Sequence, residues 1–488
     1  MTKEETSLKE DLASNIAYLK NGIGQSSDIL FQGFSIGQDK TPAMLILTEG
    51  LTETLLISDQ VIRPLQHQEF CLKQNLIKCI SSSILGIKTD QLRTFSEIGK
   101  AVLQGNGVLL VEGYSTGLSI EMKKVQQRSL EDPENESMLR GPKVGFIEEL
   151  RTNTALIRQR ANDPNLTIKE MLVGERNEKK IALLFIKGLT DRELVEDMIK
   201  RIRNIKIDDP MESGYIEQLI EDYPYSIFPQ VQTTERPDRV VSALLEGKIG
   251  ILLDGTPFAT IAPITFNAIL QTPDDYYQRW IPSSLLRILR YLSIFITIFL
   301  PGLYIAFVAF HPGLLPTTMA LAIAGSRQNV PFPPLIEALL MEITIELLRE
   351  AGLRLPKPIG QTLGLVGGVV IGQAAVQANI VSALMVVIVA VTATASFTIP
   401  QYEFSLSLRV LRFINMISAS IFGLFGVIMG FLLLIGHLCQ LESFKYEFYE
   451  PILAKDRKDL KDALLRLPLK LLPTHTQKSK RLSSKKQR

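Results

Sequence analysis

The chain contains 45 consecutive residues without a charged side chain, from Pro358 to Tyr402, and no other feature limits its possible folds as much. A membrane helix needs about 20 residues at 1.5 Å each, so this run is too long for one ordinary span. We therefore expect a broken membrane segment here. Other uncharged stretches cluster between residues 291 and 440, whereas the first ~280 residues have the charge density of a water-soluble protein. These patterns predict a soluble half followed by a membrane half.

Two further runs have the length of a membrane helix, Tyr291 to Phe310 and Phe413 to Ile435. Aromatic and basic residues precede the first run, which is typical of an interfacial belt on a cytoplasmic flank: Tyr276, Tyr277, Trp280, Arg279, Arg287 and Arg290. Arg409 and Arg412 precede the second run. The opening residues lack an apolar run of signal-peptide length, which favours a cytoplasmic N-terminus. With a cytoplasmic C-terminus as well, the number of crossings is even.

Glycines repeat every four residues inside the uncharged run, at Gly364, Gly368 and Gly372. At 100° per residue they share one side of a helix, which predicts close packing against a neighbouring helix. The opposite side carries a stripe that can line a narrow pore: Thr362, Leu365, Val369, Gln373 and Gln377. Ordinary packing, with the amides bridging neighbouring helices, is the alternative. A dinucleotide-binding loop is disfavoured because no strand precedes the glycines.

Upstream of these glycines, residues 335–356 form an amphipathic helical stretch that begins after Pro334. Its acidic side chains Glu342, Glu346 and Glu350 fall on one face together with Arg349. They either lie at the membrane interface or face a water-filled vestibule, where carboxylates attract cations. The alternative is pairing within the helix, of Glu346 with Arg349 and of Glu350 with Arg354.

The soluble half contains an internal repeat. Residues 101–113 (AVLQGNGVLLVEG) align with residues 243–255 (ALLEGKIGILLDG), and residues 28–52 align in the same way with residues 166–190. Each copy predicts a β-hairpin around a glycine turn, then a helix, and then a helix that ends at Gly105 or Gly247 before a short apolar strand. We therefore expect two tandem α/β modules, serving either as a packing scaffold or as a ligand cleft or assembly interface.

Several classes of function are excluded by what the sequence lacks. Three cysteines and four histidines show no metal-ligand spacing, and neither a phosphate-binding loop nor a nucleophile elbow is present. We therefore expect no catalytic residue, no metal and no cofactor.

The C-terminal tail is strongly basic. From Lys455 to Arg488 it contains twelve basic residues and three aspartates, a net charge of +9. This tail either binds anionic lipid or is a solvated extension, and it has no nucleic-acid-binding framework.

Many short strings, taken together, resemble the A subunits of bacterial spore germinant receptors of the GerA type. In the soluble half these strings start at Arg140 (RGPKV), Thr154 (TALIRQR), Phe228 (FPQ) and Thr234 (TERPD). In the membrane half they start at Thr272 (TPDDYY), His311 (HPGLLP), Pro331 (PFPP), Glu346 (ELLREAGLRLP) and Gly360 (GQTLGLVGG). The similarity is clearest from about residue 140 to 440.

The resemblance implies a non-enzymatic subunit in the spore inner membrane that triggers germination. Its expected partners are a transporter-like B subunit, a lipoprotein C subunit and further copies of itself, in a ring such as a pentamer. The family is thought to form a nutrient-gated ion channel, which places the pore at Val369 between Leu365 and Gln373. A non-conducting scaffold, a secondary transporter and a relative associated with dipicolinate channels remain as alternatives.

These observations define the expected organisation. The fold class is an α/β N-terminal half of two duplicated modules, followed by an α-helical polytopic membrane domain. The expected boundaries are residues 1–138 and 139–265 for the cytosolic modules, 266–440 for a membrane domain with about four crossings plus the amphipathic helix, and 441–488 for the basic tail.

Overall fold

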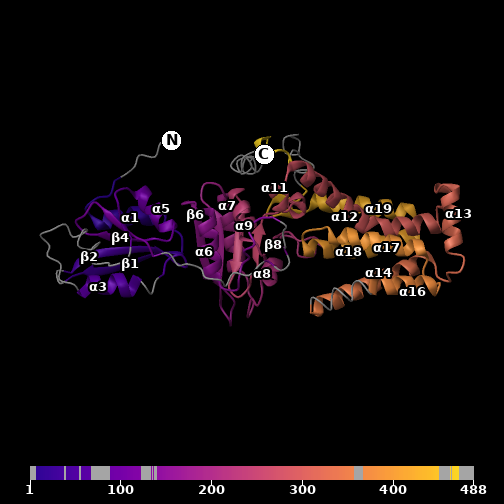
Figure 1. The fold of residues 1–488 in the computed structure, drawn as a ribbon, viewed down its shortest axis with the longest axis horizontal. Coiled ribbons are helices and arrows are strands. Elements are labelled where there is room, and N and C mark those ends of the chain that lie inside the picture. The colour runs from indigo at the N-terminus through magenta and orange to yellow at the C-terminus, as the bar shows by residue number, and fades with distance from the viewer. Residues whose placement is uncertain are drawn as a thin grey trace. The chain divides into compact units, whose positions relative to one another are not determined.

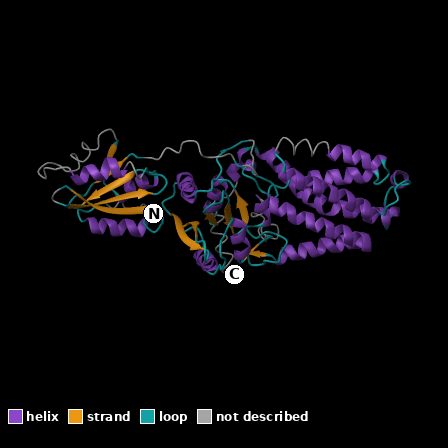
Figure 2. Cartoon of the chain, turned by 90° about the horizontal axis from the view of Figure 1, so that it is seen from below, coloured by secondary structure: helices purple, strands orange, loops and turns teal. Residues whose placement is uncertain are grey.

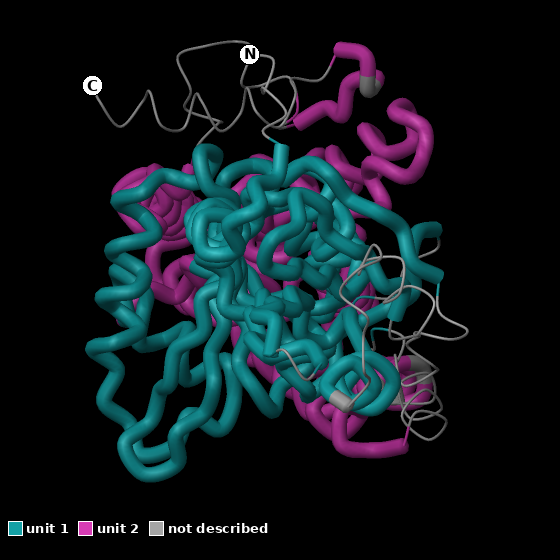
Figure 3. The backbone as a smooth tube through the Cα atoms, turned by 90° about the vertical axis from the view of Figure 1, so that its left-hand side faces the viewer, with its two compact units in different colours: residues 1–224, 231–263, 473–488 teal, residues 225–230, 264–472 magenta. Residues whose placement is uncertain are grey.

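The computed structural model describes residues 7–37, 40–53, 57–67, 88–122, 133, 136, 140–356, 367–449, 462 and 464–471. The chain divides into two compact units (Figure 3). Unit 1 comprises residues 1–224, 231–263 and 473–488, and unit 2 comprises residues 225–230 and 264–472. The finer division into four parts stays a prediction.

The first module of unit 1 contains an antiparallel sheet with helices, of which β1, β2 and β4 are labelled in Figure 1. The sheet has five strands in the order β1-β2-β4-β5-β3. Its elements are α1 (Leu12–Gly22), β1 (Ile29–Ile36), β2 (Thr41–Thr48), the π-helix η1 (Ser58–Ile62), α3 (Arg63–His67), β3 (Thr89–Leu92), α5 (Phe95–Leu103), β4 (Gly107–Val111) and β5 (Gly117–Ile120). The central strand β4 is buried along its whole length, as expected for a strand covered on both faces.

The second module repeats this arrangement with the strand order β6-β7-β9-β10-β8. Its elements are α6 (Leu150–Ala161), β6 (Leu166–Val173), β7 (Lys179–Ile186), α7 (Arg192–Arg203), α8 (Ser213–Ile220), β8 (Gln232–Thr234), α9 (Pro237–Leu245), β9 (Ile249–Leu253) and β10 (Ala259–Ala262). The predicted duplication and the α/β class of this half are therefore confirmed.

The two modules share local details that explain their common fold. Gly105 and Gly247 both adopt φ +87° directly after a helix, in the left-handed region that favours glycine. A buried asparagine in the first helix of each module donates to the carbonyl six residues earlier: Asn15 to Lys9 and Asn153 to Ile147. Equivalent residues therefore make equivalent contacts in both copies.

Unit 2 is a bundle of long helices with a small hairpin (Figures 1 and 2). Its helices are α10 (Phe266–Leu270), α11 (Asp274–Tyr277), α12 (Trp280–Ala309), the 3₁₀-helix η2 (Pro312–Leu314), α13 (Thr317–Ser326), α14 (Pro334–Arg354), the π-helix η3 (Gly367–Ile371), α16 (Gly372–Gln377), α17 (Ala383–Phe397), α18 (Tyr402–Phe422), α19 (Leu424–Gln440) and the 3₁₀-helix η5 (Leu469–Leu471). The strands β11 (Glu442–Ser443) and β12 (Tyr446–Glu447) form the hairpin.

Helices α12 and α18 are long and apolar enough to cross a membrane, with mean hydropathies of 2.3 and 1.3 over their most apolar windows. Helices α13, α17 and α19 are apolar but shorter. Side chains of α12, α14, α17, α18 and α19 together form one buried core. The prediction of a helical region with several apolar helices is therefore confirmed.

The run from Phe413 to Ile435, expected to be a single membrane helix, is instead divided between α18 and α19. Gly423 separates the two helices with φ +61°, which favours glycine. Helix α19 then packs back along α18, with Gly426 against the carbonyl of Ser418. The apolar composition of this run therefore predicted one continuous helix, whereas the structure has two helices joined by a sharp turn.

The long uncharged run is broken, as expected. Helix α16 ends at Gln377, and α17 begins after Ser382, whose side chain accepts a hydrogen bond from the amide of Met385. Tyr304 of α12 contacts the same hydroxyl at 3.2 Å. The N-terminus of α17 is thereby fixed to the longest helix of the bundle.

Candidate functional site in the helical unit

The glycine-rich segment continues from a single π-helical turn, η3, into α16. Such turns are rare and occur frequently at functional sites. A Cβ built on Gly372 would lie 3.3 Å from Cγ1 of Val386, so α16 approaches α17 closely at this residue. Gly368 is exposed and has open space beside it within the described part of the chain. Among the glycines of the predicted packing face, Gly372 therefore contacts α17.

The structure places part of the predicted pore-lining stripe. Gln373 and Gln377 both lie on α16 with exposed side chains. The backbone of Val369 belongs to η3, and its side chain lies outside the described atoms. Thr362, Leu365 and the packing residue Gly364 lie outside the described residues. Pore lining by this stripe stays a prediction.

The acidic residues of α14 occupy three different environments. Glu342 is fully buried, Glu346 is partly buried, and the side chain of Glu350 is 58% exposed. The pairs considered as an alternative to a vestibule are both present: Glu346 with Arg349 at 3.4 Å and Glu350 with Arg354 at 2.6 Å. Glu350 thus lies apart from the other two acids.

Glu342 and Glu346 contact two arginines of α18 in what we call the α14–α18 charge cluster, defined as Glu342, Glu346, Arg349, Arg409 and Arg412. Arg412 is fully buried, and its Nη2 lies 3.1 Å from Glu342 and 3.0 Å from Glu346. Arg409 donates to the other oxygen of Glu346 at 3.0 Å. Charges buried this deeply are expensive unless they are paired.

The charge cluster also reaches α17, because Nη2 of Arg349 donates to the hydroxyl of Ser396 at 3.0 Å. Three helices are therefore connected through one set of charges. The cluster contains three guanidinium groups and two carboxylates. Pairing of these charges allows α14 to pack inside the bundle, although this helix is too charged for direct contact with lipid. Sequence reasoning had noted Arg409 and Arg412 only as residues that precede an uncharged run, so this part of the site was missed.

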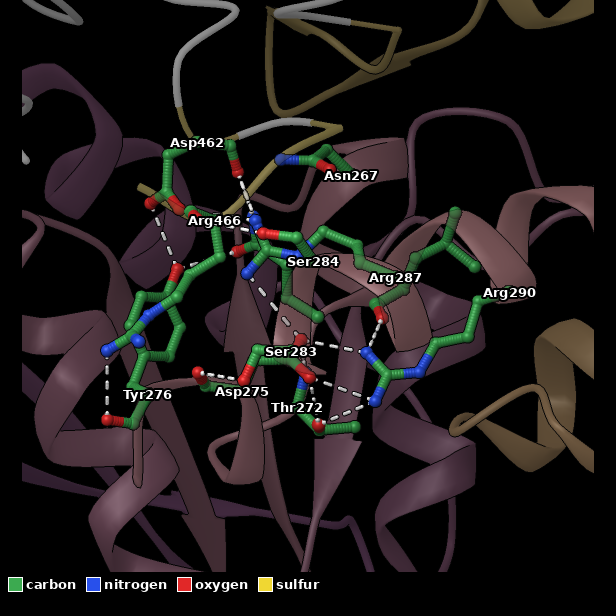
Figure 4. Close-up of polar contacts among 12 residues, drawn as sticks. Asn267, Thr272, Asp275, Tyr276, Ser283, Ser284, Arg287, Arg290, Asp462 and Arg466 are labelled. Atoms are coloured by element: carbon green, nitrogen blue, oxygen red, sulfur yellow. Dashed lines mark hydrogen bonds and ion pairs between the residues drawn. The ribbon is translucent and has the colours of Figure 1, made fainter. Parts of the chain in front are cut away.

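A second charged group joins the start of α12 to residues near the C-terminal end of the described chain (Figure 4). Arg290 makes two hydrogen bonds with Asp275, at 2.8 and 3.0 Å. Arg287 is fully buried and lies 3.5 Å from Asp275 and 3.2 Å from Asp462. Arg287 and Arg290, which were predicted as part of a basic cytoplasmic flank, thus bind carboxylates. The side of the membrane on which they lie stays a prediction. Trp280 and Tyr277 are exposed, as an interfacial belt requires.

Within the described residues, no group of three or more histidine, cysteine, aspartate or glutamate side chains is arranged to hold a metal ion. The polar features of unit 2 are instead buried ion pairs and an exposed pair of amides. Such groups fix helices relative to one another and can line a path for solutes.

Comparisons with known proteins give matches that cover almost the whole chain. A sequence model of the family described as Bacillus/Clostridium GerA spore germination protein matches residues 17–478. Spore germination protein B1 of Bacillus subtilis (strain 168) is 53% identical over 470 residues, covering 96% of this chain and 97% of that protein. Spore germination protein A1 of the same organism is 43% identical and covers 96% of each.

Two further matches concern the membrane and the soluble half. The uncharacterized membrane protein YfkQ of Bacillus subtilis (strain 168) is 43% identical, covering 94% of this chain and 89% of that protein. A crystal structure of the N-terminal domain of the A subunit of the Bacillus megaterium spore germinant receptor GerK3 is 31% identical, with a TM-score of 0.43. It covers 54% of this chain and 99% of the crystallised chain.

Proposed function

The chain belongs to the GerA family of spore germination proteins, as an A subunit of a germinant receptor, and from this premise we propose that copies of it form a nutrient-gated ion channel. The chain is a membrane protein with a few candidate spans. Membership of a receptor family agrees with the expectation that it is not an enzyme. As an A subunit it acts with the B and C subunits of the receptor.

The main support for a channel is the exposure of Gln373 and Gln377 on α16. Both amides belong to an uncharged, largely apolar region, and both side chains are exposed in the single chain. An amide facing hydrocarbon without a hydrogen-bond partner costs several kcal/mol, roughly 2–7 by transfer measurements. Water in a pore, or a second copy of the chain, removes this cost. A ring with α16 on its inner side provides both.

The proposed gate is a constriction formed by Leu365 and Val369 on the same side as these amides. Apolar constrictions close a pore by excluding water. Opening requires that the partner subunits, when nutrient is bound, interact more favourably with the open than with the closed state. The proposed locations are the spore inner membrane for the protein and the cytoplasm for both termini. The partners are proposed to be a transporter-like B subunit and a lipoprotein C subunit.

The proposal is tested by potassium release from dormant spores whose receptor carries Val369→Ala. The control is Val370→Ala, which removes the same two methyl groups from the adjacent, exposed residue. Receptor abundance is matched among the strains. We expect Val369→Ala to release potassium without germinant and Val370→Ala to behave as wild type, because the side chains of successive helical residues point in different directions.

Strictly germinant-dependent release with unchanged kinetics in Val369→Ala contradicts this pore assignment. The scaffold alternative then gains support if the purified complex also lacks a symmetric ring. Under that alternative, substitutions in the stripe change only the stability and abundance of the receptor.

A further inference from the structure

Helices α11 and α12 are separated by a two-residue hinge, Gln278 and Arg279. Both residues have extended backbones, with ψ of 176° and 147°, so the helical hydrogen bonding stops between Tyr277 and Trp280. A short extended connection of this kind has no fixed angle of its own. The angle between α11 and α12 therefore depends on side-chain contacts made across the hinge.

C-terminal residues contact the α11 side of the hinge (Figure 4). The hydroxyl of Tyr276 donates to Oδ2 of Asp462 at 3.0 Å. The guanidinium of Arg466 donates to the backbone carbonyls of Tyr276 at 3.2 Å and of Gln278 at 3.0 Å. These carbonyls lie within and directly after the last turn of α11, where a cation is favourable.

The same two C-terminal residues contact the α12 side. Nη1 of Arg287 donates to the backbone carbonyl of Asp462 at 2.6 Å and to its Oδ1 at 3.2 Å. The hydroxyl of Ser284 donates to the carbonyl of Arg466 at 2.9 Å. Asp462 and Arg466 therefore bind both helices at once, and together they span the hinge.

These contacts are buried and charge-assisted, which distinguishes them from a loosely attached tail. Asp462 is 7% exposed, Arg466 is 3% exposed and Arg287 is fully buried. Asp462 is also closer to Arg287 than Asp275 is, at 3.2 against 3.5 Å, while Asp275 is occupied by Arg290. Removal of Asp462 would leave Arg287 sharing its remaining carboxylate, which is unfavourable in a buried site.

We propose that Asp462 and Arg466 form a strap that locks the α11–α12 hinge in the resting state. Helix α12 packs against α17 and α18 in the bundle core, so a change in its angle is passed to the other membrane helices. Release of the strap favours the active state. As far as ion release is concerned, the inference rests on the proposed channel function. The position of the hinge can be measured separately.

The first measurement follows the hinge through thiol labelling of Ser283→Cys. Ser283 is fully buried beside the hinge, and its hydroxyl donates to the carbonyl of Asp275 at 2.8 Å. The full chain, with its own cysteines replaced by serine, is assembled with its partner subunits in membranes and labelled with a maleimide. Labelling of this parent is compared with labelling after Asp462→Asn, Arg466→Gln or the control Lys470→Gln, an exposed charge in the same segment.

We expect the introduced thiol to be labelled about tenfold faster in Asp462→Asn and Arg466→Gln than in the parent, because each loses charge-assisted hydrogen bonds. Lys470→Gln should label at the parent rate. Parent-rate labelling in both strap variants overturns the proposal. If they do not accumulate, Tyr276→Phe decides, since it removes one hydroxyl and no charge: about threefold faster labelling supports the strap, and no change overturns it.

The second measurement is germinant-independent potassium release from spores carrying the same substitutions without the added cysteine. Faster release in Asp462→Asn and Arg466→Gln, but not in Lys470→Gln, supports both proposals. Faster labelling without faster release supports the strap and counts against the channel. Unchanged labelling overturns the strap, whatever the Val369→Ala experiment shows.

Discussion

Arg158 of α6 is fully buried against Asp28, which immediately precedes β1 in the other module. Its Nε and Nη2 each donate to one oxygen of that carboxylate at 2.8 Å. Ser26 accepts from the same guanidinium, and the amide of Ser27 donates to the carbonyl of Ile168 in β6 at 2.8 Å. The two modules of unit 1 are therefore connected by a bidentate ion pair and by main-chain pairing.

Removal of Arg158 should strongly destabilise unit 1. Arg158→Met leaves Asp28 buried without its cation, and we expect a loss of about 3–5 kcal/mol in the free energy of unfolding. The double variant Arg158→Met with Asp28→Leu should recover most of this loss, because no uncompensated charge remains. Urea unfolding of a fragment of residues 1–263 measures both. Equal stability of the single and double variants would contradict the prediction.

The stability of unit 1 should also fall as the pH rises, because of Glu217 in α8. Burial raises the pKa of its carboxyl group, and hydrogen bonds from Thr260 and Thr233 only partly oppose this. The folded state therefore binds the proton more tightly than the unfolded chain. The contribution of Glu217 is fully present below the pKa of the unfolded chain and is lost as the pH rises through the folded pKa.

The variant Glu217→Gln tests this pH dependence, because an amide stays neutral and its oxygen can still accept a hydrogen bond. We expect it to unfold at higher urea than wild type at about pH 8 and to lose that advantage at about pH 4. Glu178→Gln, at an exposed residue of the same module, is the control. Parallel pH profiles for wild type and Glu217→Gln would show that this carboxyl group is not responsible.

The soluble modules were predictable because their signals are local and occur twice. Gly105 and Gly247 mark the same helix end in two aligned strings, so each copy supports the assignment of the other. The ion pairs of unit 2 were not predictable in this way. Glu346 and Arg412 are 66 residues apart, and Arg287 and Asp462 are 175 apart. Helical periodicity shows which face a charge occupies, but not which distant helix contacts that face.

The charge cluster and the exposed pair on α14 should respond very differently to loss of charge. Arg412→Gln removes the cation that contacts Glu342 and Glu346, and we expect a loss of about 3–5 kcal/mol in stability. Glu350→Gln breaks a pair whose side chains are both more than half exposed, so we expect a change of at most about 0.5 kcal/mol. Thermal unfolding of the detergent-purified chain and its abundance in membranes measure both effects. Similar behaviour of the two variants would mean that Arg412 is not an essential counter-charge.

The turn between α18 and α19 should tolerate no side chain at Gly426. A Cβ at this residue would lie 2.3 Å from the backbone carbonyl oxygen of Ser418, and a backbone atom cannot move aside as a flexible side chain can. Gly426→Ala must separate the two helices, at an expected cost of about 1–3 kcal/mol from overpacking.

Gly436→Ala is the control. Gly436 lies in the same helix with open space beside it among the described atoms, so this variant should gain up to about 1 kcal/mol in stability from helix propensity. A lower melting temperature for Gly426→Ala and an equal or higher one for Gly436→Ala are the expected results in detergent. Equal melting temperatures for Gly426→Ala and wild type would mean that α18 and α19 do not pack this closely.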